Sequence, residues 1–198
     1  MVTSKTERTR ALVQTTALRL FLEYGYDETT VAQVAAAAGV SHMTFFRYFP
    51  TKESVVLDDP YDPVIAEAVG TQPASLPAFE RVRLGLLGAW RRLPDLPHGE
   101  TRDRVLLCLR HPTLRAAMLE NTRRTESGIV KVLERTGVAH AEAVASAGAC
   151  LGAVMSTLVD WAADPDAALG QRIVDALEGL PGTGTRGSDI DASRRGTD

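Results

Sequence analysis

Residues 30–49 read TVAQVAAAAGVSHMTFFRYF, and this stretch decides how the rest of the chain is interpreted. Thr30 and Gln33 form a capping box, the sequence signature of a helix start, ahead of a short alanine-rich segment. Gly39 breaks that segment, because glycine adopts a positive φ at little cost. Ser41 then caps a second short helix, and the proline after the stretch ends it. The stretch therefore predicts two short helices joined by a tight turn.

Two short helices joined by a turn with glycine make a helix-turn-helix unit. The close crossing of the two helices needs a small residue, and Ala35 supplies it. An apolar wedge that fixes the crossing angle is formed by Val34, Val40, Phe45 and Phe49. The first turn of the second helix, His42-Met43-Thr44, then points outward and would reach base edges in the major groove of DNA. An ordinary helical hairpin in an all-α protein is the alternative reading of the same pattern.

Residues that start and stop helices also recur along the rest of the chain. No segment alternates apolar and polar residues as a half-buried strand does. A first helix follows Ser4 and stops at Gly25, and another starts after Thr51 but breaks at Asp58-Asp59-Pro60, so that Pro60 is expected to act as a hinge. Further helices are predicted at about 79–93, 101–110, 113–135, 141–163 and 166–180. The sequence thus predicts an all-α fold of about nine helices.

Three regions are expected from the pattern. Residues 1–50 form a helix-turn-helix head, residues 51–180 a helical body, and residues 181–198 a disordered tail of Gly, Ser, Thr, Asp and Arg. The net charge of the chain is −3, but residues 1–52 carry +2 and the remainder −5. A basic head on an acidic body indicates that the head is the part that meets an anion.

The composition narrows the classes of protein. With 198 residues, 44% apolar and 24% charged, the chain is long enough to bury a core and is typical of a soluble globular protein. The longest apolar run, Ala143 to Val159, is diluted by small and polar residues, and the start lacks a signal-peptide core. We therefore expect a cytoplasmic protein without a membrane partner, a cofactor or a metal. Cys108 and Cys150 are expected to be buried thiols, with a redox sensor as the alternative.

The segments from Thr30 to Ser41 and from Thr44 to Glu53 resemble the TetR family of transcriptional regulators. The resemblance extends from Thr9 to Val56 and includes the first helix, which ends in Tyr24-Gly25-Tyr26. It implies an all-helical homodimer, with an N-terminal DNA-binding head and a C-terminal body that binds a ligand and dimerises.

The same resemblance implies roles for residues of the head. The matched DNA-contacting positions are Thr30, Ser41, His42, Met43, Thr44, Phe46, Arg47, Tyr48 and Lys52. Thr30, Arg47 and Lys52 match phosphate contacts, and the turn that begins at His42 matches the groove-reading positions. The chain departs from the family pattern twice. Phe46 replaces a tyrosine whose hydroxyl contacts the DNA backbone, and Met43 replaces a common glycine and suits a thymine methyl group.

The body resembles the mycofactocin-regulator-like subgroup in Arg102-Asp-Arg104, in Arg110 to Ala116 and in Asp160-Trp161. That subgroup implies an acyl-CoA-like ligand. The candidate ligand residues are Phe79, Leu86, Trp90, Met118, Asn121, Thr122 and Thr125. Core packing is the alternative for the apolar members, and a solvated helix face for the polar ones. The arginines at 91, 92, 102, 104 and 110 either serve solubility or contact CoA phosphates.

Small residues recur at four-residue spacing in the segment 141–163, which lets two helices approach closely. The candidate dimer interface consists of Gly148, Leu151, Gly152, Met155, Ser156, Ile173 and Leu177. Paired across a two-fold axis, the last two predicted helices would form a four-helix bundle. Packing within one chain is the alternative.

The function these patterns favour is a ligand-responsive repressor that binds a palindromic operator as a dimer and is released by a hydrophobic or acyl-CoA-like effector. A small all-helical enzyme using the body pocket is one alternative, although the sequence carries no catalytic constellation. A ligand-independent DNA-binding or adaptor protein is the other. A filled body without a cavity would favour that last reading.

Overall fold

The computed structural model describes residues 5–58, 62–92, 98–164 and 168–181. Over these residues the chain forms ten helices and no strand, which confirms the predicted all-α class. In chain order the helices are α1 Lys5–Tyr24, α2 Val31–Ala37, α3 His42–Tyr48, α4 Lys52–Leu57, α5 Asp62–Gly70, α6 Ala78–Trp90, α7 His98–Arg110, α8 Pro112–Glu134, α9 His140–Ala163 and α10 Leu169–Glu178.

The helix count exceeds the predicted nine because the segment after Thr51 forms two separate helices, α4 and α5. The break that the sequence predicts therefore separates two short elements. Pro60, the expected hinge, lies outside the described residues, and so does the predicted tail from residue 182 onward.

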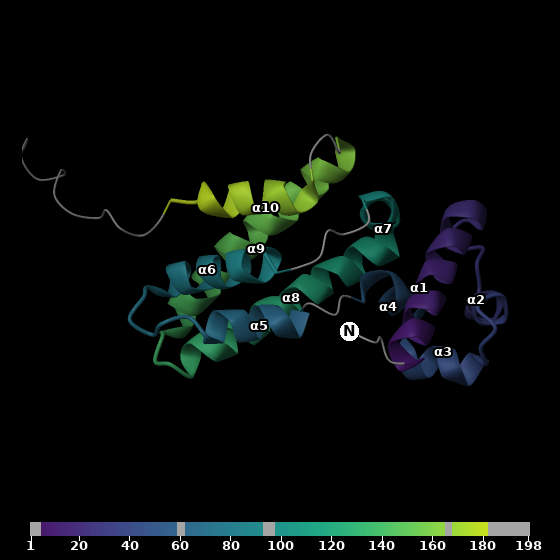
Figure 1. The fold of residues 1–198 in the computed structure, drawn as a ribbon, viewed down its shortest axis with the longest axis horizontal. Helices are drawn as coiled ribbons and strands as arrows, with labels where there is room; N and C mark the ends of the chain where they lie inside the picture. Colours follow the sequence, from purple (N-terminus) through teal and green to yellow (C-terminus); the bar gives the residue numbers. More distant parts are fainter. Residues whose placement is uncertain (1–4, 59–61, 93–97, 165–167, 182–198) are drawn as a thin grey trace, which may run out of the picture.

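The molecule is elongated (Figure 1). Helices α1, α2 and α3 lie together at one end, and α5, α6, α9 and α10 lie toward the other. Helix α4 lies between the two groups, close to α1 and to the long helix α8. Any movement of the body relative to the head therefore involves the surroundings of α4.

Local signals shape the head as the sequence predicts. The Gln33 N–H donates to the Thr30 hydroxyl at 3.2 Å, and the Thr30 N–H donates to the Gln33 side-chain oxygen at 2.7 Å, which completes the capping box. Gly25 and Gly39 have φ values of +94° and +66°, the left-handed conformation that ends α1 and turns the chain between α2 and α3.

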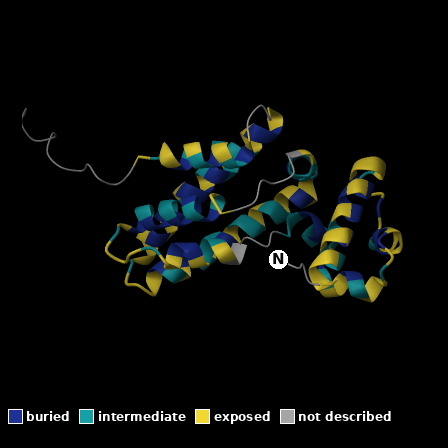
Figure 2. Ribbon diagram, viewed as in Figure 1, coloured by how far each residue is buried: buried dark blue, intermediate teal, exposed yellow. Residues whose placement is uncertain are grey.

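The body core forms where α5, α6, α8, α9 and α10 pack together. Trp161 of α9 is fully buried in it. Gly85 of α6 has no room for a side chain, because a Cβ there would lie 2.8 Å from backbone atoms of Val69 in α5. Figure 2 shows the buried residues as stripes along the helices, with exposed residues on their outer faces.

The hydrophobic core of the head continues into the body. Phe45 and Phe49, both fully buried, belong to one apolar cluster with Cys108 of α7 and Leu114 of α8. His111, just before α8, adds a polar contact, because its Nε2 lies 3.0 Å from the Asp27 carboxylate. The corner between α7 and α8 is therefore part of the packing that holds the head.

Helix α9 is the one helix in the described part of the chain that is long and apolar enough to cross a membrane. Its most apolar window has a mean hydropathy of 1.5, but only 33% of that window is buried. The helix packs against α6, α7, α8 and α10, as the central helix of a folded body does. The low burial means that an apolar face of α9 is left uncovered in a single chain.

Candidate functional site

Helices α2 and α3 cross closely at the end of the molecule. Val34 and Ala35 are buried at the crossing, and the Val40 N–H donates to the Ala35 carbonyl at 2.9 Å across the turn. Phe45 fills the space beneath α3. The small residue at Ala35 and the apolar wedge thus lie where the sequence places them.

The first turn of α3 faces solvent. The Thr44 N–H donates to the Ser41 hydroxyl at 3.0 Å, which fixes the start of the helix. The Ser41 and Thr44 hydroxyls also lie 2.9 Å apart. Met43 is 82% exposed, the largest exposed fraction among the large apolar side chains of the described residues. An exposed methionine at a helix start has no packing role, and this makes the turn a candidate contact surface.

The exposed His42, Phe46 and Arg47 of α3, with the half-buried Tyr48, form an aromatic and cationic face. The Phe46 ring is 40% exposed and meets the His42 ring edge-on, with ring centres 4.8 Å apart. The Arg47 guanidinium lies 5.1 Å from the Tyr48 ring centre. Together with Met43 these four side chains present a surface suited to bases and phosphates.

Lys52 does not point freely into solvent. Its ammonium donates to the Tyr26 carbonyl and lies 4.0 Å from the Tyr26 ring centre and 5.4 Å from that of Phe21. Burial lowers the pKa of Lys52 and raises the pKa of Tyr26, whose hydroxyl donates to Glu53 at 2.9 Å. Lys52, which is predicted to contact a DNA phosphate, therefore already contacts Tyr26 within the head.

A groove with a volume of about 630 Å³ runs between α8 and α9. It is lined by Pro112, Arg115, Ala116, Met118, Leu119, Thr122, Glu126, Gly148, Leu151, Gly152 and Met155. Met118 also packs against the apolar core of the head. The groove brings together two predicted ligand residues, Met118 and Thr122, and four residues predicted for the dimer interface.

The other predicted ligand residues lie elsewhere. Leu86 is fully buried in the body core, and Phe79 and Trp90 pack partly buried against that core, because the apolar face of α6 is covered by α5, α9 and α10. The buried position of Leu86 agrees with the core-packing alternative, and Leu86 does not line the groove between α8 and α9. On α8, the Thr125 hydroxyl donates to the Asn121 carbonyl at 3.3 Å, and neither residue lines the groove.

The predicted dimer residues divide between surface and interior. Ile173 and Leu177 are fully buried within one chain, because the apolar face of α10 covers α6 and α9, so they form no exposed surface. Gly152 and Ser156 are exposed. Val144 and Val159, which the sequence analysis did not single out, are also exposed apolar residues on α9, at 38% and 37%. Their helical spacing from Gly148 and Gly152 was the available signal.

The body arginines do not form one cluster. Arg91 pairs with Glu178, whereas the Arg102 Nε donates to the Ala162 carbonyl at 3.0 Å. Arg104 donates to carbonyls of α4.

The two cysteines, Cys108 and Cys150, are buried, and burial raises the pKa of each thiol to about 11.

Comparison with known proteins agrees with this arrangement. Residues 15–58 match the family described as "Bacterial regulatory proteins, tetR family", and residues 76–183 match the "MftR C-terminal domain" family. The HTH-type transcriptional regulator TcmR of Streptomyces glaucescens is 34% identical over 134 residues, which cover 67% of this chain and 55% of TcmR. The chain thus spans about half the length of that relative.

Solved structures share the fold. NalD, the secondary repressor of the MexAB-OprM multidrug efflux pump in Pseudomonas aeruginosa, aligns with a TM-score of 0.52 and 20% identity over 87% of this chain and 93% of NalD. SmeT, the repressor of the Stenotrophomonas maltophilia efflux pump SmeDEF, aligns with a TM-score of 0.53 and 17% identity over 88% of this chain and 89% of SmeT.

Proposed function

We propose that this chain, which belongs to the TetR family of bacterial regulatory proteins, is an effector-responsive repressor of the cytoplasm. As a member of that family it is a transcriptional regulator and not an enzyme. We propose further that it binds a palindromic operator as a homodimer. The observation that carries the proposal is the solvent-facing first turn of α3, where Met43 is 82% exposed. We assign DNA binding to residues 1–50 and effector binding and dimerisation to residues 51–180.

The proposed DNA surface sorts into base and backbone contacts. His42, Met43 and Thr44 read base edges in the major groove, and the apolar end of Met43 suits a thymine methyl group. The groups assigned to phosphates and sugars are Thr30, Ser41, Arg47, Tyr48 and Lys52. Phe46 contributes packing alone. The Lys52 ammonium has three N–H donors, so one can stay on the Tyr26 carbonyl while another reaches a phosphate.

The proposed dimer uses the uncovered face of α9. This face carries the exposed Val144, Gly152, Ser156 and Val159, and no atom outside its own helix turn lies within 4 Å of a Cβ built at Gly152. Gly152 also lines the groove between α8 and α9, so the proposed dimer face borders that groove. Room at a glycine on an apolar helix face suits the close approach of a second helix. To read successive major grooves, the two α3 helices of this dimer must lie about one DNA turn apart, ~34 Å.

The proposed effector site is the groove between α8 and α9. Its wall is mainly apolar, with Arg115 and Glu126 as the charged lining residues. An apolar molecule with an anionic end, such as an acyl-CoA, fits this lining because Arg115 can pair with a phosphate. The presence of a groove favours an effector-responsive regulator over a ligand-independent DNA-binding protein.

The test begins by selecting an operator from random DNA duplexes with the wild-type protein, and then measures the footprint, the number of chains bound and the salt dependence of binding. A footprint with two-fold symmetry, two chains per site and steep weakening with salt are expected. One chain on an asymmetric site would contradict the dimer. Titration of lauroyl-CoA and lauric acid, with and without operator, then tests the effector. Operator must weaken effector binding by the factor by which the effector weakens operator binding. Equal affinity in both arms would leave a regulator without this response.

A further inference from the structure

The carboxyl end of α4 is held by side chains from two different parts of the molecule. A helix end leaves carbonyl groups without partners inside the helix. In α4 these include the carbonyls of Val55 and Val56, followed by that of Asp58 after the last turn. The side chains that donate hydrogen bonds to these carbonyls determine which parts of the molecule hold α4 in place.

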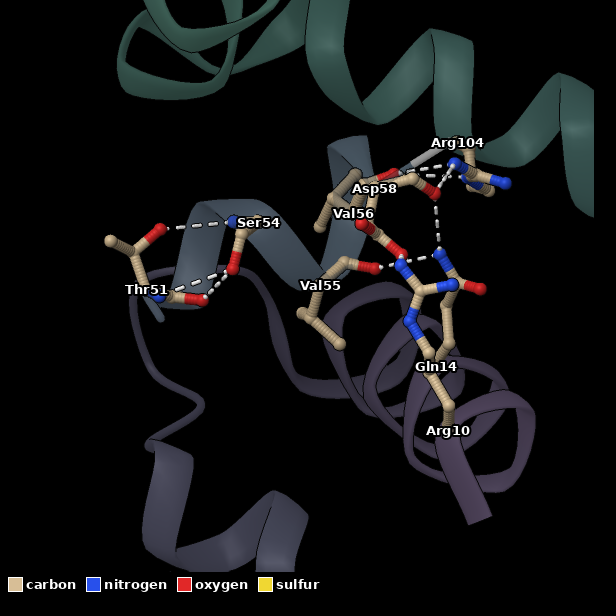
Figure 3. A network of polar contacts seen from close by, with 8 residues as sticks. All are labelled: Arg10, Gln14, Thr51, Ser54, Val55, Val56, Asp58 and Arg104. Carbon is tan, nitrogen blue, oxygen red and sulfur yellow. Dashed lines mark hydrogen bonds and ion pairs between the residues drawn. The ribbon is translucent and has the colours of Figure 1, made fainter. Parts of the chain in front are cut away.

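One partner comes from the head. The Gln14 side-chain amide, on α1, donates to the Val55 carbonyl at 3.1 Å and to the Asp58 carbonyl at 3.1 Å. Arg10, one turn earlier on α1, pairs with the Asp58 carboxylate. Helix α1 therefore holds both the backbone and the side chain at this end of α4 (Figure 3).

The other partner comes from the body. Arg104 of α7 donates to the Val56 carbonyl from Nε at 3.0 Å and from Nη2 at 2.8 Å, and Nη2 also donates to the Asp58 carbonyl at 3.3 Å. Figure 3 shows Arg104 and Gln14 reaching the same segment from opposite sides. Among the described residues no carboxylate lies within ion-pair distance of Arg104, so its charge serves these carbonyls.

We call this set of contacts the α4 clamp: Gln14 and Arg104 on the carbonyls of Val55, Val56 and Asp58. A cation at the carboxyl end of a helix is favourable, and the planar guanidinium can satisfy two carbonyls at once. Helix α7 also places Cys108, one turn beyond Arg104, in the apolar core of the head. Both polar and apolar contacts thus connect α7 to the head.

We propose that Arg104 is a positioning residue for DNA recognition, through which the body sets the orientation of the head. The inference rests on the proposed function and deepens it. Helix α7 packs on α8 and α9, whose side chains line the groove. A shift of α7 moves Arg104, the end of α4 and, through the shared Asp58 carbonyl, α1. This route does not depend on the chain between α4 and α5.

Arg102 provides a matched control on the same helix. It is partly buried like Arg104, and its Nε donates to the Ala162 carbonyl at the carboxyl end of α9, inside the body. Arg102→Met therefore removes a brace within the body, whereas Arg104→Met removes a brace between body and head. A purely structural role predicts the same outcome for both.

The experiment measures head orientation directly and operator affinity separately. Nitroxides are placed on exposed Glu28→Cys and Arg135→Cys, since the native thiols are buried, and labelled chains are diluted with unlabelled protein. Arg104→Met should broaden the head–body distance distribution and weaken binding to the selected operator by about tenfold, the equivalent of about 1.4 kcal/mol. Arg102→Met should leave both readouts within twofold of the wild type.

Two further variants keep the proposal open to refutation if Arg104→Met fails to fold. Arg104→Lys keeps the charge but not the two-carbonyl geometry, and it should give an intermediate distribution. Gln14→Ala should reproduce the broadening from the head side. Equal behaviour of the Arg102 and Arg104 variants, or an unchanged distribution in Arg104→Lys and Gln14→Ala, overturns the proposal. If the wild type binds no palindromic operator, the proposed function fails while the distance measurement still tests the clamp.

Discussion

Replacing Gly152 with leucine separates the stability of one chain from the stability of the dimer. A Cβ at this position meets no atom within 4 Å inside the chain, whereas one at Gly148 lies 3.4 Å from the Glu126 carboxylate. The first side-chain atom of Gly152→Leu therefore has room in the monomer, and the rest of the leucine borders the α8–α9 groove that Gly152 also lines. The substitution should gain roughly 0.5–1 kcal/mol of helix stability, because glycine is a poor helix former.

The dimer should respond in the opposite direction. An overfilled helix contact costs ~1–3 kcal/mol, and a symmetric interface contains the substitution twice. At about 1.4 kcal/mol for each factor of ten, the smaller total of ~2 kcal/mol raises the dimer Kd roughly 25-fold. Sedimentation over a dilution series measures the Kd, and thermal unfolding at the lowest concentration measures the single chain.

Gly99→Leu is the matched control for this experiment. A Cβ at Gly99 of α7 also meets no atom within 4 Å, and Gly99 is not one of the residues of the proposed α9 interface. It should leave the Kd of the dimer unchanged. A Gly152→Leu protein with the wild-type Kd would refute the reasoning and place the interface elsewhere.

Three further outcomes are expected. Lys52→Ala should reduce the salt dependence of operator binding by roughly one ion per half-site and also lower the melting temperature, because the ammonium contact with the Tyr26 ring is lost; an unchanged salt slope would limit Lys52 to the internal contact. Cys108 and Cys150, with pKa values raised by burial to about 11, should remain protonated at pH 8 and react with Ellman's reagent only on unfolding, and rapid reaction in the native protein would revive a redox role. Leu86→Ala should lower the free energy of unfolding by ~2–5 kcal/mol in a denaturant titration while leaving the affinity for lauroyl-CoA unchanged, and a selective loss of affinity would return Leu86 to the effector site.

Features fixed by neighbouring residues could be predicted from the sequence. The capping box at Thr30, the positive φ at Gly39 and the outward first turn of α3 depend on a few adjacent residues and on the chemistry of turns. They needed no knowledge of the body. The all-α class follows from the same local punctuation repeated along the chain.

Features that depend on pairing between distant helices could not be predicted in this way. Leu86, Ile173 and Leu177 have the spacing of an apolar face, but that spacing does not say whether the face meets its own chain, a ligand or a second copy. The inward turn of Lys52 depends on Tyr26, 26 residues away. The role of Arg104 depends on α4, 48 residues from it, so its sequence neighbourhood of arginines was misleading.

The apolar core that the head shares with Cys108 and Leu114 limits how regulators of this kind can be recombined. A chimera cut between residues 50 and 51 would expose one side of Phe49 to a foreign body, and it would also separate Gln14 from the carbonyls of α4. Exchange of operator specificity between such proteins therefore requires transplanting the DNA-reading surface of α3 alone, or moving the head together with α4 and the α7–α8 corner. The head of this protein therefore cannot be exchanged as an independent domain, because it packs against α4 and the α7–α8 corner.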